Sequence, residues 1–114
     1  MDQPKLCDLT CGPCKGGTPP MTRDEIAPLM PQVPKWQLIG GEDEHLAIER
    51  IWKFKDFAQA QAFVDAVGAL AEREGHHPDI AYGWGYARIT LWTHAANGLT
   101  RNDFIVAAKI DLLP

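Results

Sequence analysis

The chain has 114 residues, of which 46% are apolar and 23% charged, the composition of an ordinary globular domain. Its net charge of −4 disfavours a nucleic-acid binder that neutralises phosphates, and equally a polybasic protein of membrane surfaces. No apolar run approaches the roughly 18 residues of a membrane span, and the N-terminus lacks the basic and apolar regions of a signal peptide. We therefore expect a cytoplasmic protein with no nucleic-acid or membrane partner.

The first 20 residues contain all three cysteines, together with prolines and glycines, and show no apolar periodicity. We interpret residues 1–20 as a loose leader in front of a single domain, residues 21–114. The spacing Cys7-x3-Cys11-x2-Cys14 is that of the cluster-binding loop of radical S-adenosylmethionine enzymes, but the chain is too short for their barrel. A zinc knuckle would need a fourth ligand nearby. Free thiols remain the expected state of these cysteines.

The first elements of the domain are a helix and a hairpin. Thr22 and Glu25 have the spacing of a capping box, which predicts a helix that runs towards Met30, although Pro28 removes a backbone donor inside it. Residues 36–39 form a short apolar run before two glycines, and residues 45–54 alternate between apolar and polar side chains. These patterns predict two antiparallel strands.

The second half of the domain is predicted to contain a long helix, two strands and a last helix. Residues 57–74 carry an apolar stripe at helical spacing, with Asp56 as the predicted N-cap and Gly75 as the C-terminal stop. A short extended piece then leads to an alternating strand at residues 86–94. Thr100 and Asp103 form a second capping box, which begins the last helix. The order α-β-β-α-β-β-α predicts an α+β domain in which helices cover an antiparallel sheet.

Three of the four histidines, His76, His77 and His94, are the strongest candidates for chemistry. His76 and His77 lie at a corner between Gly75 and Pro78, and imidazoles can act as proton donor and acceptor near neutral pH. Ordinary surface histidines and a zinc site are the alternatives. Zinc is disfavoured because adjacent side chains diverge. Proton transfer is the hypothesis we prefer.

Glu72 and Trp92 are further candidates beside the histidines. Glu72 precedes His76 by one helical turn and could support it. Trp92 shares a predicted strand face with Tyr86 and His94, and could form one wall of a flat aromatic pocket. The other three tryptophans are expected in the core or at a subunit interface.

Several of these residues lie in segments that resemble the pterin-4a-carbinolamine dehydratases. The resemblance extends from about residue 36 to residue 110. Its segments are Trp52-Lys53-Phe54-Lys55-Asp56-Phe57, Glu72-x3-His76-His77-Pro78, Trp84, Thr93-His94 and Gly98-Leu99-Thr100-Arg101-Asn102-Asp103-Phe104. The resemblance implies a four-stranded antiparallel sheet with three helices on one face.

The resemblance also implies an activity and a division of roles. These hydro-lyases convert 4a-hydroxytetrahydrobiopterin to quinonoid dihydrobiopterin in tetrahydrobiopterin recycling, without metal or cofactor. By position, His76 and His94 are similar to the acid/base histidines and His77 to the pterin-binding histidine. Glu72 and Asp103 match the supporting acidic positions, and Thr93 matches a residue beside the site. His45 lies outside the most specific segments and is expected to tolerate substitution.

The resemblance implies partners as well. These are the pterin substrate, further copies of the chain in a homodimer or homotetramer, and an aromatic amino acid hydroxylase as the source of substrate. Related domains that lost the histidines act as assembly factors or dimerisation partners, so a non-catalytic module on the same fold is the alternative. The intact histidine trio favours the enzyme.

Overall fold

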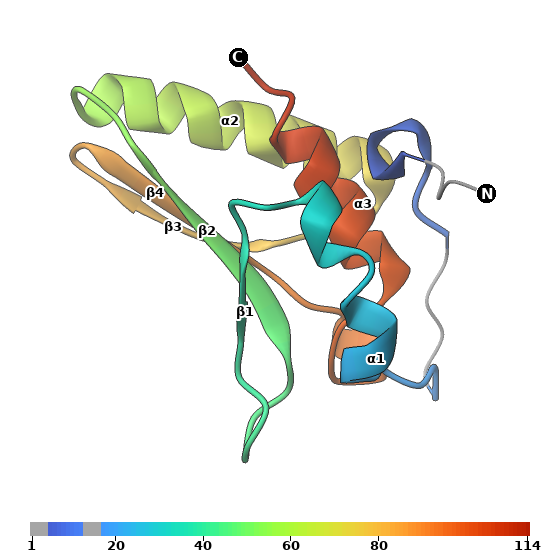
Figure 1. The fold of residues 1–114 in the computed structure, drawn as a ribbon. Coiled ribbons are helices and arrows are strands. Elements are labelled where there is room, and N and C mark those ends of the chain that lie inside the picture. The colour runs from blue at the N-terminus through green and yellow to red at the C-terminus, as the bar shows by residue number, and fades with distance from the viewer. Residues whose placement is uncertain (1–4, 13–16) are drawn as a thin grey trace.

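Four antiparallel strands in the order β1-β2-β4-β3 form the sheet, and helices lie on one of its faces (Figure 1). The computed structural model describes residues 5–12 and 17–114. Within them the strands are β1 (Gln37–Ile39), β2 (Ala47–Lys53), β3 (Asp79–Gly83) and β4 (Tyr86–Leu91), and the helices are α1 (Arg23–Ile26), α2 (Phe57–Glu74) and α3 (Arg101–Ile110). This is the predicted α-β-β-α-β-β-α order. The α+β fold class expected from the sequence is therefore confirmed.

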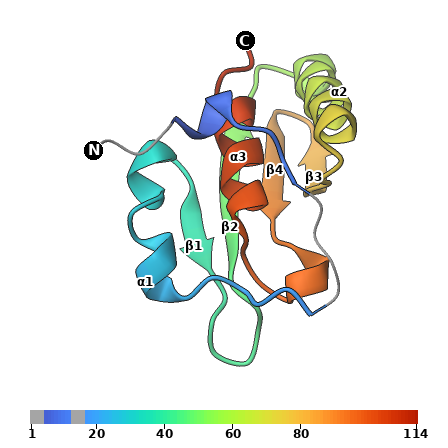
Figure 2. The ribbon, with the colours of Figure 1, turned by 90° about the vertical axis from the view of Figure 1, so that its right-hand side faces the viewer.

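The register of β2 and β4 decides which side chains face the helices. Ile48 pairs with Leu91 and Trp52 with Ala87, and Ile48, Leu91 and Ala87 are completely buried. All three helices lie in front of this face in Figure 2. Ile51, which precedes Trp52 in β2, points to the opposite face and is 52% exposed. The alternation read from the sequence therefore separates the core face from an open face.

Helices α2 and α3 supply most of the remaining core. The apolar stripe of α2 is buried as predicted. Helix α3 passes across the middle of the sheet (Figure 2), and all its residues from 102 to 108 are buried. Neither of these helices, nor any other in the part of the chain that the structure describes, is long and apolar enough to cross a membrane.

Two elements are shorter than the sequence predicts. Helix α1 has the expected capping box but ends at Ile26, not near Met30, because Pro28 cannot donate to a helical carbonyl. Strand β4 ends at Leu91 and not at His94, since Leu91 is the last residue of β4 with a ladder partner. His94 instead begins a short 3-10 helix, residues 94–96.

Residues 5–12 are packed against the domain, in contrast to the loose leader expected for this segment. Leu6 is buried in the core. The Cys11 amide donates to Oε1 of Glu74 at 3.0 Å, and Gly12 exchanges two hydrogen bonds with the Asn102 side chain. Burial and the neighbouring Glu74 carboxylate raise the pKa of the Cys11 thiol to about 12. Cys14 lies outside the described residues. The N-terminal segment is therefore hydrogen-bonded both to the end of α2 and to the start of α3.

Candidate active site

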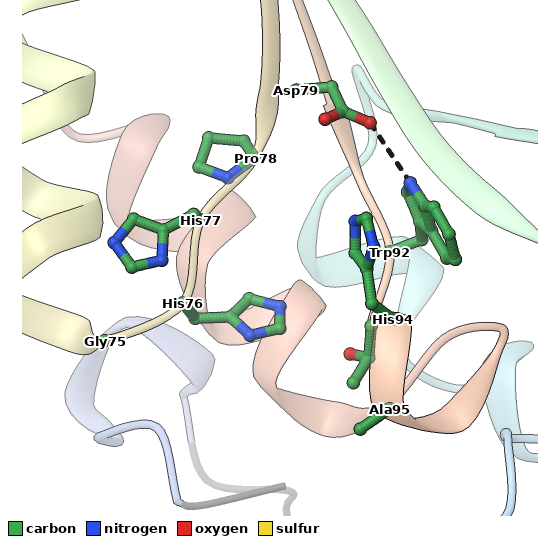
Figure 3. Close-up of a pocket in the computed structure, with 9 residues that line it drawn as sticks. Gly75, His76, His77, Pro78, Asp79, Trp92, His94 and Ala95 are labelled. Atoms are coloured by element: carbon green, nitrogen blue, oxygen red, sulfur yellow. Dashed lines mark hydrogen bonds between the residues drawn. The ribbon is translucent and has the colours of Figure 1, made fainter. Parts of the chain in front are cut away.

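A cavity of about 330 Å³ lies between the α2–β3 corner and the segment that links β4 to α3 (Figure 3). It is lined on one side by residues 75–79 and on the other by residues 92–95. The three candidate histidines are all in this lining, and so are Trp92 and Thr93. Two short segments at the two ends of the β3–β4 hairpin thus form opposite walls of one pocket.

The corner after α2 directs two consecutive histidines in opposite directions. Gly75 adopts a left-handed conformation with φ 66°, and the amide of His76 donates to the Ala71 carbonyl at 3.2 Å, which ends the helix. In Figure 3 the His76 ring points towards His94, whereas the His77 ring points back towards α2. Only one of the two adjacent imidazoles therefore faces His94 across the pocket.

His76 is held by a buried carboxylate. Its Nε2 lies 2.6 Å from Oδ1 of Asp103, whose side chain is 0% exposed, while the His76 side chain is 11% exposed. A carboxylate only accepts hydrogen bonds, so Nε2 carries the proton of this bond. The neutral ring then has its lone pair on Nδ1, which is free to exchange a proton with a ligand. Asp103 therefore fixes both the tautomer and the direction of His76.

The same carboxylate also begins α3. Oδ2 of Asp103 accepts the Thr100 amide at 2.9 Å, in the capping box that the sequence predicts. It also accepts the Thr93 hydroxyl at 2.8 Å. The Thr93 proton is used in this bond, so the 2.8 Å contact between the two threonine hydroxyls is donated by Thr100. A buried charge with all these partners is well satisfied, which keeps Asp103 in one position.

Trp92 and His94 form the aromatic wall that the sequence suggested. Their rings are stacked with centroids 3.8 Å apart and an interplanar angle of 20°. The indole Nε1 donates to Oδ2 of Asp79 at 3.1 Å (Figure 3). Tyr86, which was expected on the same strand face, is at the opposite end of β4, paired with Gly83. The wall is therefore built from the segment after the strand and not from the strand itself.

Glu72 does not support His76, contrary to the expectation from helical spacing. Its Oε1 lies 2.7 Å from Nε2 of His77, and both side chains are largely exposed. Solvent-exposed ion pairs of this kind contribute little to stability. Glu72 therefore belongs to the surface beside the corner, while Asp103 is the carboxylate that acts on His76.

Among residues 5–12 and 17–114, no group of three His, Cys, Asp or Glu side chains is arranged to hold a metal ion. The rings of His76 and His77 point in opposite directions (Figure 3). The donors that do converge, an imidazole and a carboxylate, are already bonded to each other. His76 is thus an imidazole with one ring nitrogen held by a buried carboxylate.

Two residues of the site were not found from the sequence. Asp79 follows Pro78 and bonds to Trp92, but no periodic signal distinguishes it. The alternating pattern predicts a strand from His45, whereas β2 begins at Ala47. The His45 ring is stacked on Trp92 with centroids 3.5 Å apart. The β1–β2 loop reaches Trp92 only through the tertiary fold, so local sequence carries no signal for this contact.

Comparison with known proteins gives a consistent result. The family model of the pterin 4 alpha carbinolamine dehydratases matches residues 19–113. A protein of Aromatoleum aromaticum is 52% identical over 107 residues, which cover 94% of this chain and 93% of that protein. One of Methylococcus capsulatus is 47% identical over 113 residues, which cover 99% and 96% of the two chains. Both bear the name "Putative pterin-4-alpha-carbinolamine dehydratase".

Two solved structures share the fold at 33% sequence identity. A "transcriptional coactivator/pterin dehydratase" of Brucella melitensis has a TM-score of 0.72, with 81% of this chain and 95% of that chain covered. A "pterin dehydratase-like protein", described as a RuBisCO assembly factor of the alpha-carboxysome, has a TM-score of 0.57, with 68% and 86% covered. With the family match over most of its length and relatives near 50% identity, the chain belongs to the pterin 4 alpha carbinolamine dehydratase family.

Proposed function

We propose that the protein is a hydro-lyase that dehydrates 4a-hydroxytetrahydrobiopterin to quinonoid dihydrobiopterin. The observation that carries this proposal is the pair formed by His76, oriented by buried Asp103, and His94, on the other wall of the same cavity. Membership of the family supports the reaction class. In this function the substrate would come from an aromatic amino acid hydroxylase, and the protein would recycle the spent pterin.

The reaction needs one proton donor and one proton acceptor. The bond from C4a to the hydroxyl oxygen breaks, and the oxygen must gain a proton because hydroxide is a poor leaving group. The lone pair of the adjacent ring nitrogen forms the new double bond to C4a. That nitrogen then loses its own proton, so the products are water and the quinonoid dihydropterin. No hydride moves, and no redox cofactor is required.

The proposed roles follow the directions of the side chains. His76 keeps Nδ1 for proton exchange because Nε2 is bonded to Asp103. His94 stands on the opposite wall, so a flat ring between them would meet a donor on one side and an acceptor on the other. His77 lines the same cavity, but its ring points back towards Glu72 and does not face His94, so we do not assign it a proton transfer. The pterin-binding role proposed for His77 rests on the family resemblance. Two imidazoles are thus sufficient for the chemistry without a metal.

The direct test is an assay of quinonoid dihydropterin formation from a freshly generated 4a-hydroxytetrahydropterin. We expect the purified protein to accelerate this step above the spontaneous rate, and the double variant His76→Ala/His94→Ala to lose the acceleration. Pretreatment with a strong chelator should leave the rate unchanged. No acceleration by the wild-type protein would contradict the enzyme proposal. Loss of activity with chelator and recovery with zinc would contradict the metal-free mechanism.

A non-catalytic assembly module is the second candidate function. One structural neighbour at 33% identity is described as an assembly factor, so the fold can serve that role in a relative. The two functions differ in their dependence on the histidines. An assembly function would survive His76→Ala, whereas dehydration would not. The intact His76–Asp103 pair and the facing His94 favour the enzyme.

We also propose that the protein is a homodimer or homotetramer. The sheet face opposite the helices exposes Ile51 by 52% and Tyr86 by 37%, and β1 and β3 are edge strands of the described sheet. Apolar side chains on an open sheet face and unpaired edges both favour association with another copy. Light scattering at micromolar concentration should give a multiple of the 12.6 kDa chain mass. A monomeric mass would contradict this proposal.

A further inference from the structure

Trp92 lies between two imidazole rings, only one of which belongs to the cavity lining. His94 is stacked on the indole with centroids 3.8 Å apart, and His45 is stacked on it with centroids 3.5 Å apart. The interplanar angles are 20° and 19°. Two rings stacked this closely would overlap if they shared one face of the indole. His45 and His94 therefore flank Trp92 on opposite faces.

The orientation of His94 depends on this stack. His76 and His77 are each fixed by a carboxylate. In the part of the chain that the structure describes, the His94 ring has no hydrogen-bond partner, and Trp92 is the ring against which it stacks. A movement of the indole would therefore change the direction of His94, whereas it would leave His76 in place.

The indole itself is held in two ways. The hydrogen bond from Nε1 to Asp79 at 3.1 Å fixes one edge of the ring, but a single bond at the edge still permits the ring to tilt. His45 covers the face opposite His94 and prevents that tilt. Trp92 is only partly buried, so core packing does not hold it instead.

The β1–β2 loop has a backbone that brings His45 to this position. Gly40 has φ 84°, and a Cβ atom on it would lie 2.1 Å from the His45 carbonyl oxygen. The amide of Gly41 donates to the Glu44 carbonyl at 3.1 Å, which closes the loop just before His45. Only glycine at position 40 allows this close approach of the two sides of the loop. The position of His45 is thus set by backbone geometry.

We propose that His45 is a positioning residue of the site, which acts on His94 through the indole of Trp92. The proposal rests on the dehydratase function, because positioning matters only if His94 transfers a proton. The His45 ring holds the indole of Trp92 in place, so that His94 keeps its distance and direction relative to His76. Removal of the ring should therefore impair turnover more than protein stability, and another flat aromatic ring should replace it.

The test compares His45→Ala with His45→Phe, with Glu42→Ala in the same loop as the matched control. We expect His45→Ala to lower kcat about tenfold with an unchanged Tm, since small misplacements of a reacting group have effects of this order or larger. His45→Phe should restore most of kcat, and Glu42→Ala should behave as the wild type. Unchanged kcat in His45→Ala, or equal loss in His45→Phe and His45→Ala, would overturn the proposal.

A second measurement is independent of activity. The indole N–H signal of Trp92, assigned by its absence in Trp92→Phe, reports whether the ring is held against Asp79. We expect faster exchange of this proton with water in His45→Ala and the wild-type rate in His45→Phe. The same exchange rate in all three proteins would contradict the bracing contact. If the wild type lacked activity but showed these exchange rates, the dehydratase proposal would fail while the contact would stand.

Discussion

Asp103 accepts the Nε2 proton of His76 at 2.6 Å although its side chain is 0% exposed, and the same carboxylate caps α3. Oδ2 thus accepts the hydrogen bond that begins α3, and Oδ1 accepts the hydrogen bond that orients His76. The arrangement makes the orientation of His76 as rigid as the start of the helix. A buried carboxylate bonded to one nitrogen of an imidazole is a recurring way to fix a proton-transfer group.

The first prediction separates the three histidines. His76→Ala and His94→Ala should lower kcat on the order of 10²–10⁴-fold with smaller changes in KM, because both rings face the cavity as proton-transfer groups. His77→Ala should mainly raise KM, since its ring does not face His94 and the family resemblance implies a pterin-binding role for this residue. Steady-state kinetics of the three variants would check this. Equal losses of kcat in all three would show that the division of roles is wrong.

The second prediction concerns the Asp103 carboxylate. In Asp103→Asn the amide oxygen can still accept from Thr100 and Thr93, which turns the NH2 group towards His76. The His76 Nε2 would then have to accept a hydrogen bond, so its proton would move to Nδ1. Nδ1 would become a hydrogen-bond donor, whereas in the wild type it carries the lone pair. We expect kcat to fall on the order of 10²–10⁴-fold. Nitrogen chemical shifts of His76 should report the changed tautomer, and an unchanged tautomer with full activity would contradict this account.

The third prediction tests the backbone of the corner. Gly75 has φ 66° and nothing within 4 Å of an added Cβ. Gly75→Ala should therefore lower the free energy of unfolding by about 1–2 kcal/mol, through conformational strain alone. Gly68 lies inside α2 and also has open space around an added Cβ. Gly68→Ala should therefore stabilise the protein by roughly 0.5–1 kcal/mol. Urea unfolding of both variants would check the opposite signs, and a stabilised Gly75→Ala would refute the argument.

The fourth prediction is a pH dependence of stability. The Lys109 ammonium, 2.9 Å from Glu74, holds the pKa of that carboxyl below its ordinary value of 4.5. A carboxyl with a lower pKa in the folded state stabilises the fold above its unfolded-state pKa, and this contribution is lost as the pH falls through the folded-state pKa. Glu74→Gln should therefore lower the free energy of unfolding by about 1–2 kcal/mol at pH 7, and by progressively less below pH 4.5.

The matched control for this prediction is Glu72→Gln. Glu72 lies on the same helix, but its side chain is 78% exposed and its ion pair with His77 is open to solvent. We expect Glu72→Gln to change the free energy of unfolding by less than about 1 kcal/mol. If the effect of Glu74→Gln were the same at pH 7 and at pH 3, the ion pair with Lys109 would not be its cause.

Local sequence was sufficient for much of the fold. The stripe of α2, the two capping boxes and the alternation of β2 all depend on contacts between residues close in the chain, and the structure has each of them. The ends of α1 and β4 were less predictable. Pro28 ends α1. The end of β4 depends on how far the neighbouring strands extend, which is not a local property.

The site was only partly predictable for the same reason. The candidate residues His76, His94, Trp92 and Asp103 could be selected from their types and from the family resemblance. Their partners could not, because the choice between Glu72 and Asp103 as the support of His76 depends on how α3 packs beside the α2–β3 corner. His45 reaches Trp92 from the β1–β2 loop, nearly 50 residues away in the chain. Sequence by itself determined the order of the elements and the candidate side chains, while tertiary packing decided which groups are paired, since pairing depends on distances that no local pattern encodes.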